Sequence, residues 1–342
     1  MLATALAKAS DSTPAASTND QRTVLLVVGL PGEEEYAAEF NAWAENWRKA
    51  AELAKAKWIA IGLPAREAAE QASSNAPSGE SAPGGHDRDQ LKKVLEEEAK
   101  DGGELWVILI GHGTFNGKEA KFNLRGPDFT ALEMVDWLKP FQRPVAFINC
   151  AAASAPFINA LSGSNRVVVS ATRSGYEQNY ARFGKYLSEG IGGLKADLDK
   201  DGQTSLLEAF IIASKQAAEF YKNEGRLATE HALLDDNHDG YGTPADWFRG
   251  VRATKKPAQG SSADGLRAHQ MHLVRSEEEQ KLTPETRAKR DELELSVMKL
   301  REEKAQLAEE EYYHRLETFL LDIAKIYGLS TNAPKIEASA EK

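Results

Sequence analysis

The sequence of 342 residues predicts an α/β protein, a three-layer α/β/α sandwich with a mainly parallel sheet. Short runs of Val, Ile and Leu alternate along the chain with segments whose apolar residues recur at helical spacing. Strands that alternate with helices favour a parallel sheet, because each helix crosses from one strand to the next. The runs are nearly continuous in apolar residues, as is typical of strands that are buried on both faces. Together, the alternation and the continuous runs predict this fold class.

The expected elements follow from glycine and proline boundaries and from apolar spacing. The first predicted helix shows the spacing most clearly, since Tyr36, Phe40, Trp43 and Trp47 recur at intervals of three and four residues. The predicted strands are 22–28, 57–63, 105–110, 144–150 and 165–172. The predicted helices are 33–56, 89–103, 128–140 and 155–163, with a Ser-, Gly- and Pro-rich loop at 71–87.

Composition excludes several classes of protein. The formal net charge is −10, and no basic face is evident, so nucleic-acid binding is not expected. A single cysteine, Cys150, excludes an internal disulfide framework. No apolar run approaches the roughly 18 residues of a membrane span. The first residues lack a basic region and a full apolar region, so they do not form an intact signal peptide.

Changes of composition divide the chain into six parts. We expect a flexible tail at 1–21, the α/β domain at 22–195, an acidic-loop region at 196–250, a linker at 251–275, a long helix at 276–328 and a tail at 329–342.

The long helix carries an apolar stripe. Thr283 is suited to cap the helix and Pro284 to its first position. The stripe consists of Tyr313, Leu316, Leu320, Ile323 and Tyr327, at coiled-coil spacing. It is compatible with packing onto the domain, with packing onto the earlier part of the same segment, and with a homo-oligomer or a partner protein.

Two predicted strands lead to residues whose side chains could act in catalysis. His112 stands between two glycines after the strand at 105–110, and Cys150 ends the strand at 144–150. The carboxyl ends of neighbouring parallel strands meet at one edge of a sheet, so the two side chains are expected to meet. An imidazole can hold a thiol as thiolate and later protonate a leaving amine.

Further features fit this chemistry. The backbone N–H groups of Gly113 and Cys150 are candidate oxyanion donors, and the small residues 151–153 leave room for a substrate. Taken singly, Cys150 reads as a buried structural cysteine and His112 as a loop or capping histidine. The combined pattern favours a catalytic dyad.

At these residues the sequence resembles the caspase–hemoglobinase fold of cysteine peptidases, and within it the legumain-like peptidases. Three stretches over about 22–187 carry the resemblance: "LWVILIGHG", "VAFINCAAAS" and "VVVSATRSGYEQNYARFGKYL". The third is similar to the legumain stretch that forms a wall of the substrate pocket. The resemblance implies a His–Cys dyad, no metal in the chemistry, and cleavage after a polar or charged P1 residue.

Substrate preference departs from that pattern. Legumains carry an acidic pocket residue two positions before the cysteine, where this chain has Ile148. The candidate pocket residues, each equally able to be a solvated loop residue or a helix cap, are Arg173, Ser174, Glu177 and Asn179.

An acidic loop at 197–208 matches the calcium-binding EF-hand pattern. Carboxylates wrap a hard cation, glycine at the sixth position allows a sharp turn, and the last Glu binds with both oxygens. The expected ligands are Asp197, Asp199, Asp201, Gln203 through its backbone, and Glu208, with an exit helix from 206.

A second loop, at 235–246, is a weaker match because Asp replaces Glu at the last position and Pro244 breaks an exit helix. The expected ligands are Asp235, Asn237, Asp239, Tyr241 through its backbone, and Asp246. Calcium is the expected cofactor, in a structural or regulatory role. Calcium use favours an extracytoplasmic location, with the signal peptide absent from this chain.

The sequence therefore predicts a cysteine endopeptidase that acts on a peptide or protein substrate through Cys150 and His112. The alternative is a non-catalytic calcium-binding interaction scaffold on a caspase-like fold, with an inert dyad.

Overall fold

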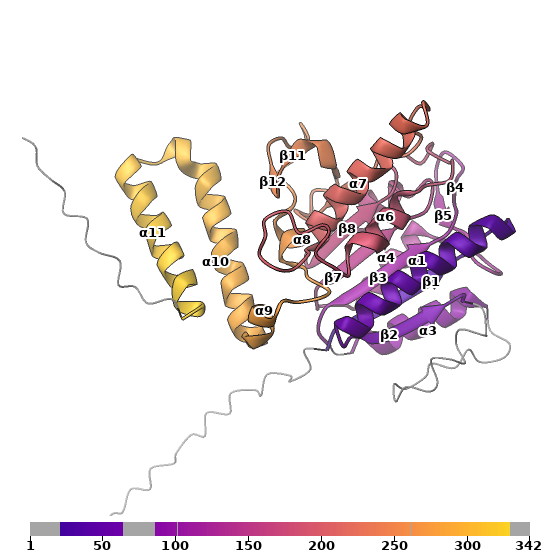
Figure 1. Ribbon diagram of the computed structural model, residues 1–342, viewed down its shortest axis with the longest axis horizontal. Coiled ribbons are helices and arrows are strands. Elements are labelled where there is room, and N and C mark those ends of the chain that lie inside the picture. Colours follow the sequence, from indigo (N-terminus) through magenta and orange to yellow (C-terminus); the bar gives the residue numbers. More distant parts are fainter. Residues whose placement is uncertain (1–20, 64–85, 101, 261, 329–342) are drawn as a thin grey trace, which may run out of the picture.

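The centre of the protein is a seven-stranded sheet with strand order β10-β9-β8-β7-β3-β1-β2 (Figure 1). The computed structural model describes residues 21–63, 86–100, 102–260 and 262–328. The strands are β1 (Thr23–Val28), β2 (Lys57–Ile61), β3 (Leu105–Ile110), β7 (Val145–Asn149), β8 (Arg166–Ser170), β9 (Leu233–Asp235) and β10 (Thr243–Pro244). The first five are parallel to one another, and β9 pairs antiparallel with both β8 and β10. The predicted, mainly parallel sheet is confirmed.

Helices cover both faces of this sheet (Figure 1). One face packs against α1 (Glu34–Leu53), α6 (Phe183–Gly190) and α7 (Leu206–Asn223). The other face packs against α3 (Asp87–Glu98), α4 (Ala131–Leu138) and α5 (Pro156–Leu161). Because side chains alternate along a strand, β3 sends Trp106, Ile108 and Ile110 to the first layer and its other residues to the second. The three-layer sandwich is therefore confirmed.

Two small antiparallel sheets flank the main one. The first contains β4 (Gly113–Phe115), β5 (Ala120–Phe122) and β6 (Phe129–Thr130), and it starts directly after His112. The second contains β11 (Phe248–Arg249) and β12 (Arg252–Ala253), after the 3-10 turn η1 (Ala245–Trp247).

The segment 251–275 is a packed part of the domain, so the prediction of a linker is wrong. It contains β12 and the short helix α8 (Leu266–Gln270). Ala268 and Leu273 are fully buried in the first layer, and the backbone N–H of Leu206 donates to the carbonyl of Met271. The prediction failed because the Gly- and Ser-rich composition at 257–265 is typical of a linker, and only a few apolar residues of the segment pack into the core.

The region predicted as one long helix, 276–328, is divided. It contains α9 (Glu277–Lys281), α10 (Pro284–Glu303), the 3-10 turn η2 (Lys304–Gln306) and α11 (Glu309–Ile326), and α10 and α11 form a hairpin away from the sheet (Figure 1). Thr283 caps α10, as expected, by accepting from the N–H of Thr286.

The fold-back gives each helix a partner. Leu300 of α10 and Tyr312 of α11 are buried, and Arg290 donates to the Tyr327 hydroxyl at 2.8 Å. A single extended helix would leave these groups in water, which explains the turn. Packing onto the earlier part of the segment is thereby confirmed, while Tyr313 and Leu320 stay about half exposed. Oligomerisation through them stays a prediction.

The structure tests some remaining expectations only in part. The two predicted tails, apart from Gln21, and the loop at 71–87, apart from His86 and Asp87, lie outside the described residues. Within the described ranges, every helix is too short or too polar to cross a membrane.

Candidate functional site

His112 and Cys150 follow two neighbouring parallel strands. In the ladder of β3 and β7, Leu109 lies opposite Asn149, so the two residues leave the sheet at the same edge. Cys150 belongs to the apolar cluster on the α1, α6 and α7 side, and the His112 ring contacts α1 through Tyr36. The topology therefore brings the pair to one edge and one face, as the sequence predicts.

The His112 imidazole is held by an aromatic cluster formed with Tyr36, Phe40, Trp43 and Tyr180. Its ring centroid lies 5.3 Å from that of Tyr36, 5.5 Å from that of Phe40 and 6.3 Å from that of Tyr180. Nε2 lies 2.8 Å from the carbonyl oxygen of Pro31, to which it donates in the matching tautomer. Within the described part of the chain, no hydrogen bond joins His112 to Cys150.

The Cys150 thiol is closed off from solvent, with 1% of the residue exposed. A Cβ added at Gly184 of α6 would meet both the Cys150 side chain and the Trp43 ring, so all three are in close contact. Burial raises the pKa of the thiol far above its ordinary value, and the charge of Glu230 raises it further. In this arrangement the cysteine is a thiol and not a thiolate.

Glu230 is the charged residue that contributes to the raised pKa of the Cys150 thiol. Its buried carboxylate accepts the N–H groups of Arg182 and Phe183 at the start of α6, and the Tyr221 hydroxyl at 3.0 Å. A helix N-terminus stabilises a nearby thiolate when its N–H groups are free, but here they serve Glu230. Sequence reasoning missed this residue, because it is far from Cys150 along the chain and belongs to no motif.

The glycines beside His112 have a packing role. A Cβ on Gly111 would lie 2.9 Å from the Phe122 ring, and one on Gly113 would lie 2.2 Å from the carbonyl oxygen of Ala152. Only glycine permits these approaches. The backbone N–H of Cys150 donates to Leu109 at 2.9 Å, so this candidate oxyanion donor is already used by the sheet.

The small residues after Cys150 are packed instead of lining an open space. Ala151, Ala152 and Ala153 are buried, and the N–H of Ala153 donates to the carbonyl of Glu177 at 2.8 Å. The segment 173–182, named here the covering segment, thus lies against the loop that follows Cys150. The expectation of substrate room at 151–153 is corrected, since this segment takes that position.

Tyr180 anchors the covering segment on the aromatic cluster. Its ring stacks on Tyr36 with centroids 4.5 Å apart, and its hydroxyl donates to Glu39. The Arg182 guanidinium lies 5.2 Å from the Tyr180 ring centroid. Sequence reasoning missed Tyr180, although it stands inside the stretch quoted for the resemblance.

The four candidate pocket residues all lie on the covering segment. Glu177 is engaged by Arg173 at 3.3 Å and by His231 at 2.5 Å, and the Ser174 hydroxyl accepts the N–H of Tyr176. Asn179 is exposed. Ile148 is fully buried within β7.

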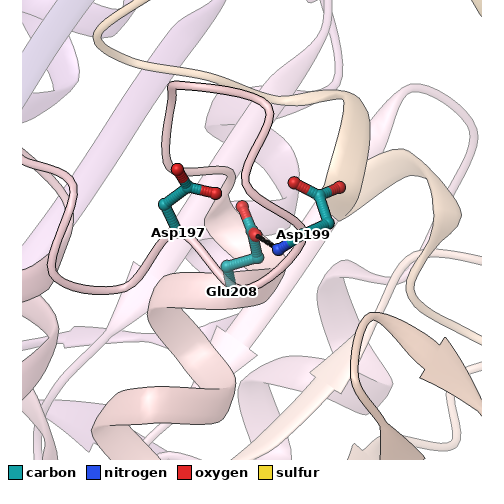
Figure 2. Close-up of side chains that lie close together, drawn as sticks. All are labelled: Asp197, Asp199 and Glu208. Carbon is teal, nitrogen blue, oxygen red and sulfur yellow. Dashed lines mark hydrogen bonds between the residues drawn. The ribbon is translucent and has the colours of Figure 1, made fainter.

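The first acidic loop brings three of its predicted ligands together. Carboxylate oxygens of Asp197, Asp199 and Glu208 all lie within 4.8 Å of one another (Figure 2). Asp197 accepts the N–H of Lys200 at 2.7 Å and that of Gly202 at 3.3 Å, which closes the turn around its carboxylate. Oxygen donors of this kind are the ligands that calcium prefers.

The predicted exit helix is confirmed as α7. Ser205 caps it and exchanges hydrogen bonds with Glu208, since the Ser205 side chain accepts the N–H of Glu208 and the Glu208 carboxylate accepts the N–H of Ser205. Asp201 and Gln203 bond to each other, and His269 lies 3.2 Å from Asp199.

The second loop has no exit helix. The chain continues from Asp235 at the end of β9, through the turn that holds Asn237 and Asp239, to β10. Tyr241 follows that turn, and its N–H donates to Asp239 at 2.8 Å. Asp246, the predicted last ligand, lies in η1.

Comparisons with known proteins give only distant likenesses. No family model matches the chain. No curated protein matches it either. The structure is similar to caspase-1 from Spodoptera frugiperda, with TM-score 0.37 and 11% identity over 68% of this chain and 94% of that chain. It is also similar to the Drosophila initiator caspase Dronc, with TM-score 0.38 and 11% identity over 67% of this chain and 83% of that chain. Scores this low assign neither a family nor an activity.

Proposed function

We propose that the protein is a cysteine endopeptidase in which Cys150 is the nucleophile and His112 the general base and acid. The observation that carries the proposal is their position just after adjacent parallel strands, at one edge and on one face of the sheet. This edge is where parallel α/β sheets bind ligands.

Peptide-bond hydrolysis by this pair requires few functional groups. The thiolate attacks the carbonyl carbon of a peptide bond, and the His112 imidazolium protonates the leaving amine. Water then hydrolyses the thioester with the same imidazole as base. The N–H of Gly113 is the oxyanion donor that we retain, because the N–H of Cys150 is bonded to Leu109.

The described arrangement corresponds to a closed state of this enzyme. Cys150 is buried, burial and the charge of Glu230 raise the pKa of its thiol, and His112 is bonded to Pro31. Catalysis therefore requires the covering segment and Tyr180 to move away from the sheet edge. We propose that Arg173, Ser174, Glu177 and Asn179, which lie on that segment, then border the substrate.

We also propose that the first loop binds calcium. The fit rests on the cluster of Asp197, Asp199 and Glu208 and on the turn that Asp197 closes. The ion would fix the loop that joins α6 to α7, and α6 packs directly against Cys150. This connection suits a structural or regulatory role.

One observation favours the second candidate, a calcium-binding interaction scaffold. The burial of Cys150 and the raised pKa of its thiol are typical of a structural cysteine. In that case the exposed apolar residues of α11, such as Tyr313 and Leu320, would serve a partner protein.

Peptide cleavage by the full chain separates the two functions. A peptide library is incubated with the wild type and with Cys150→Ser, with and without calcium, and the cleaved ends are read by mass spectrometry. The peptidase proposal expects wild-type cleavage under at least one condition, with a defined P1 residue, and none with Cys150→Ser. Cleavage that is unchanged in Cys150→Ser, or absent from the wild type under both conditions, contradicts it.

A further inference from the structure

The second acidic loop repeats the backbone of the first loop. Lys200 and Gly202 have φ values of 65° and 86°, and the equivalent residues His238 and Gly240 have 72° and 75°. The fifth residue of each loop donates its N–H to the side chain of the third, at 3.2 Å in the first loop and 2.9 Å in the second. The two turns therefore share these backbone features, although only the first leads into a helix.

In the first loop, the proposed last ligand, Glu208, accepts a characteristic set of hydrogen bonds from other loop residues. One oxygen of Glu208 accepts the N–H groups of Leu198 and Asp199, the second and third loop residues, at 2.7 and 3.2 Å. The other oxygen accepts the hydroxyl of Ser205, the ninth loop residue, at 2.8 Å. These contacts place the carboxylate beside Asp197 and Asp199 (Figure 2).

In the second loop, the same contacts are made by Asp264. One of its oxygens accepts the N–H groups of Asp236 and Asn237, again the second and third loop residues, at 3.0 and 3.2 Å. The other accepts the hydroxyl of Thr243, the ninth loop residue, at 2.5 Å. Asp246, which holds the last position by sequence, makes none of these contacts.

Asp235, the first residue of the second loop, indicates that a ligand is missing from this arrangement. It is 1% exposed, and neither of its carboxylate oxygens has a hydrogen-bond partner among the described residues. The Ser162 hydroxyl and the Gly240 N–H influence its pKa, but neither meets the geometry of a hydrogen bond. Its counterpart Asp197 accepts two N–H groups. A buried ionised carboxylate without partners is strongly unfavourable, and it either takes up a proton or binds a cation.

The surrounding charge is also negative. Asp235 lies near the carboxylates of Asp236 and Asp239. Asp264 is 3% exposed and lies near Asp235 and Asp236. Asp236 itself is satisfied by the N–H groups of Gly265 and Ala268. Asp235 and Asp264 are therefore the two carboxylates that a bound cation would compensate.

We propose that the second loop is a calcium site whose last ligand is Asp264, supplied by a separate segment of the chain in place of Asp246. The other ligands are Asp235, Asn237, Asp239 and the backbone carbonyl of Tyr241. A set of carboxylate, amide and carbonyl oxygens matches a hard cation of this size. The ion would fasten the segment 262–265 to the end of β9, independently of any peptidase activity.

Calcium titration of the full chain by calorimetry, after removal of metal with a chelator, tests this site. The wild type is compared with Asp235→Asn and Asp264→Asn, which keep the side-chain shapes, and with Asp246→Asn as the matched control. We expect Asp235→Asn and Asp264→Asn each to bind one calcium fewer than the wild type, and Asp246→Asn to bind the same number. Wild-type stoichiometry in both Asp235→Asn and Asp264→Asn overturns the proposal.

Asp197→Asn separates the two loops and also covers the case in which Asp264→Asn does not fold. If the second loop binds calcium, Asp197→Asn retains one ion, and the double variant Asp197→Asn/Asp246→Asn retains it too. Loss of all calcium in Asp197→Asn, or loss of the remaining ion when Asp246→Asn is added, overturns the assignment of Asp264. A wild type that binds a single ion, lost in Asp264→Asn and kept in Asp197→Asn, supports this site while contradicting calcium at the first loop.

Discussion

The edge of the sheet at His112 and Cys150 and the first acidic loop differ in how far each is arranged for its proposed chemistry. In the loop, three carboxylates converge within 4.8 Å and backbone N–H groups hold them in place. At the sheet edge, burial and the charge of Glu230 raise the pKa of the Cys150 thiol, and the imidazole of His112 is bonded to Pro31. The first loop could bind an ion as it stands, whereas the sheet edge needs a conformational change before Cys150 can react with a substrate. If the pair is catalytic, as we propose, access to Cys150 would control its activity.

The largest expected effect is that of removing the imidazole. His112→Ala should lower kcat/KM for peptide cleavage by about 10²–10⁴-fold, the usual contribution of a general acid–base group. The matched control is His314→Ala, which removes an exposed histidine of α11. Cleavage by His112→Ala at the wild-type rate would show that the edge of the sheet is not the catalytic site.

A smaller effect is expected at the first loop. Asp197→Asn should weaken its calcium binding by more than about a hundredfold, because even the loss of a group that supports a metal ligand costs about 10–100-fold. Calorimetry on the full chain measures the affinity, and Asp89→Asn on the exposed surface of α3 is the control. Equal calcium affinity in Asp197→Asn and in the control would contradict calcium binding by the first loop.

The smallest effect concerns the pKa of the thiol. Burial and Glu230 both raise that pKa, so the alkylation rate of wild-type Cys150 should still be rising with pH where a free cysteine has levelled off. Glu230→Gln removes the negative charge, lowers the thiol pKa and should move the profile to lower pH. At a fixed pH below the thiol pKa, lowering that pKa by about one should raise the rate about tenfold. Glu189→Gln, exposed on α6, is the control. Superimposable profiles would mean that Glu230 does not act on the thiol.

The sequence predicts the sheet and the approximate position of the pair because both depend on local patterns. Continuous apolar runs such as 105–110 predict buried strands, and parallel topology brings their ends together. The closure of the site depends instead on contacts between distant segments, such as Tyr180 with α1 and Glu230 with the start of α6. No local pattern encodes these contacts.

The acidic loops also show that local sequence patterns do not predict contacts between distant segments. The first loop carries its proposed ligands in one continuous stretch, so the spacing of the sequence can suggest all of them. In the second loop, spacing predicts Asp246, whereas the hydrogen bonds lead us to propose Asp264, from a Gly- and Ser-rich stretch that reads as a linker. A ligand supplied from another segment would leave no periodic signal in the sequence.

The central claim is that Cys150 and His112 form a reactive pair behind the covering segment, and thiol alkylation tests it most directly. Iodoacetamide labelling of Cys150 is timed by mass spectrometry in the wild type, in Tyr180→Ala and in Tyr180→Ala/His112→Ala. Tyr176→Ala, which alters an exposed residue of the same segment, is the control. Circular dichroism verifies that each variant is folded.

We predict slow labelling in the wild type and in Tyr176→Ala. We predict a rate at least about tenfold higher in Tyr180→Ala, as expected when the thiol pKa falls by about one, and loss of that increase when His112 is also removed. If Tyr180→Ala labels equally fast with and without His112, the opened thiol is not paired with the imidazole, and the central claim is contradicted.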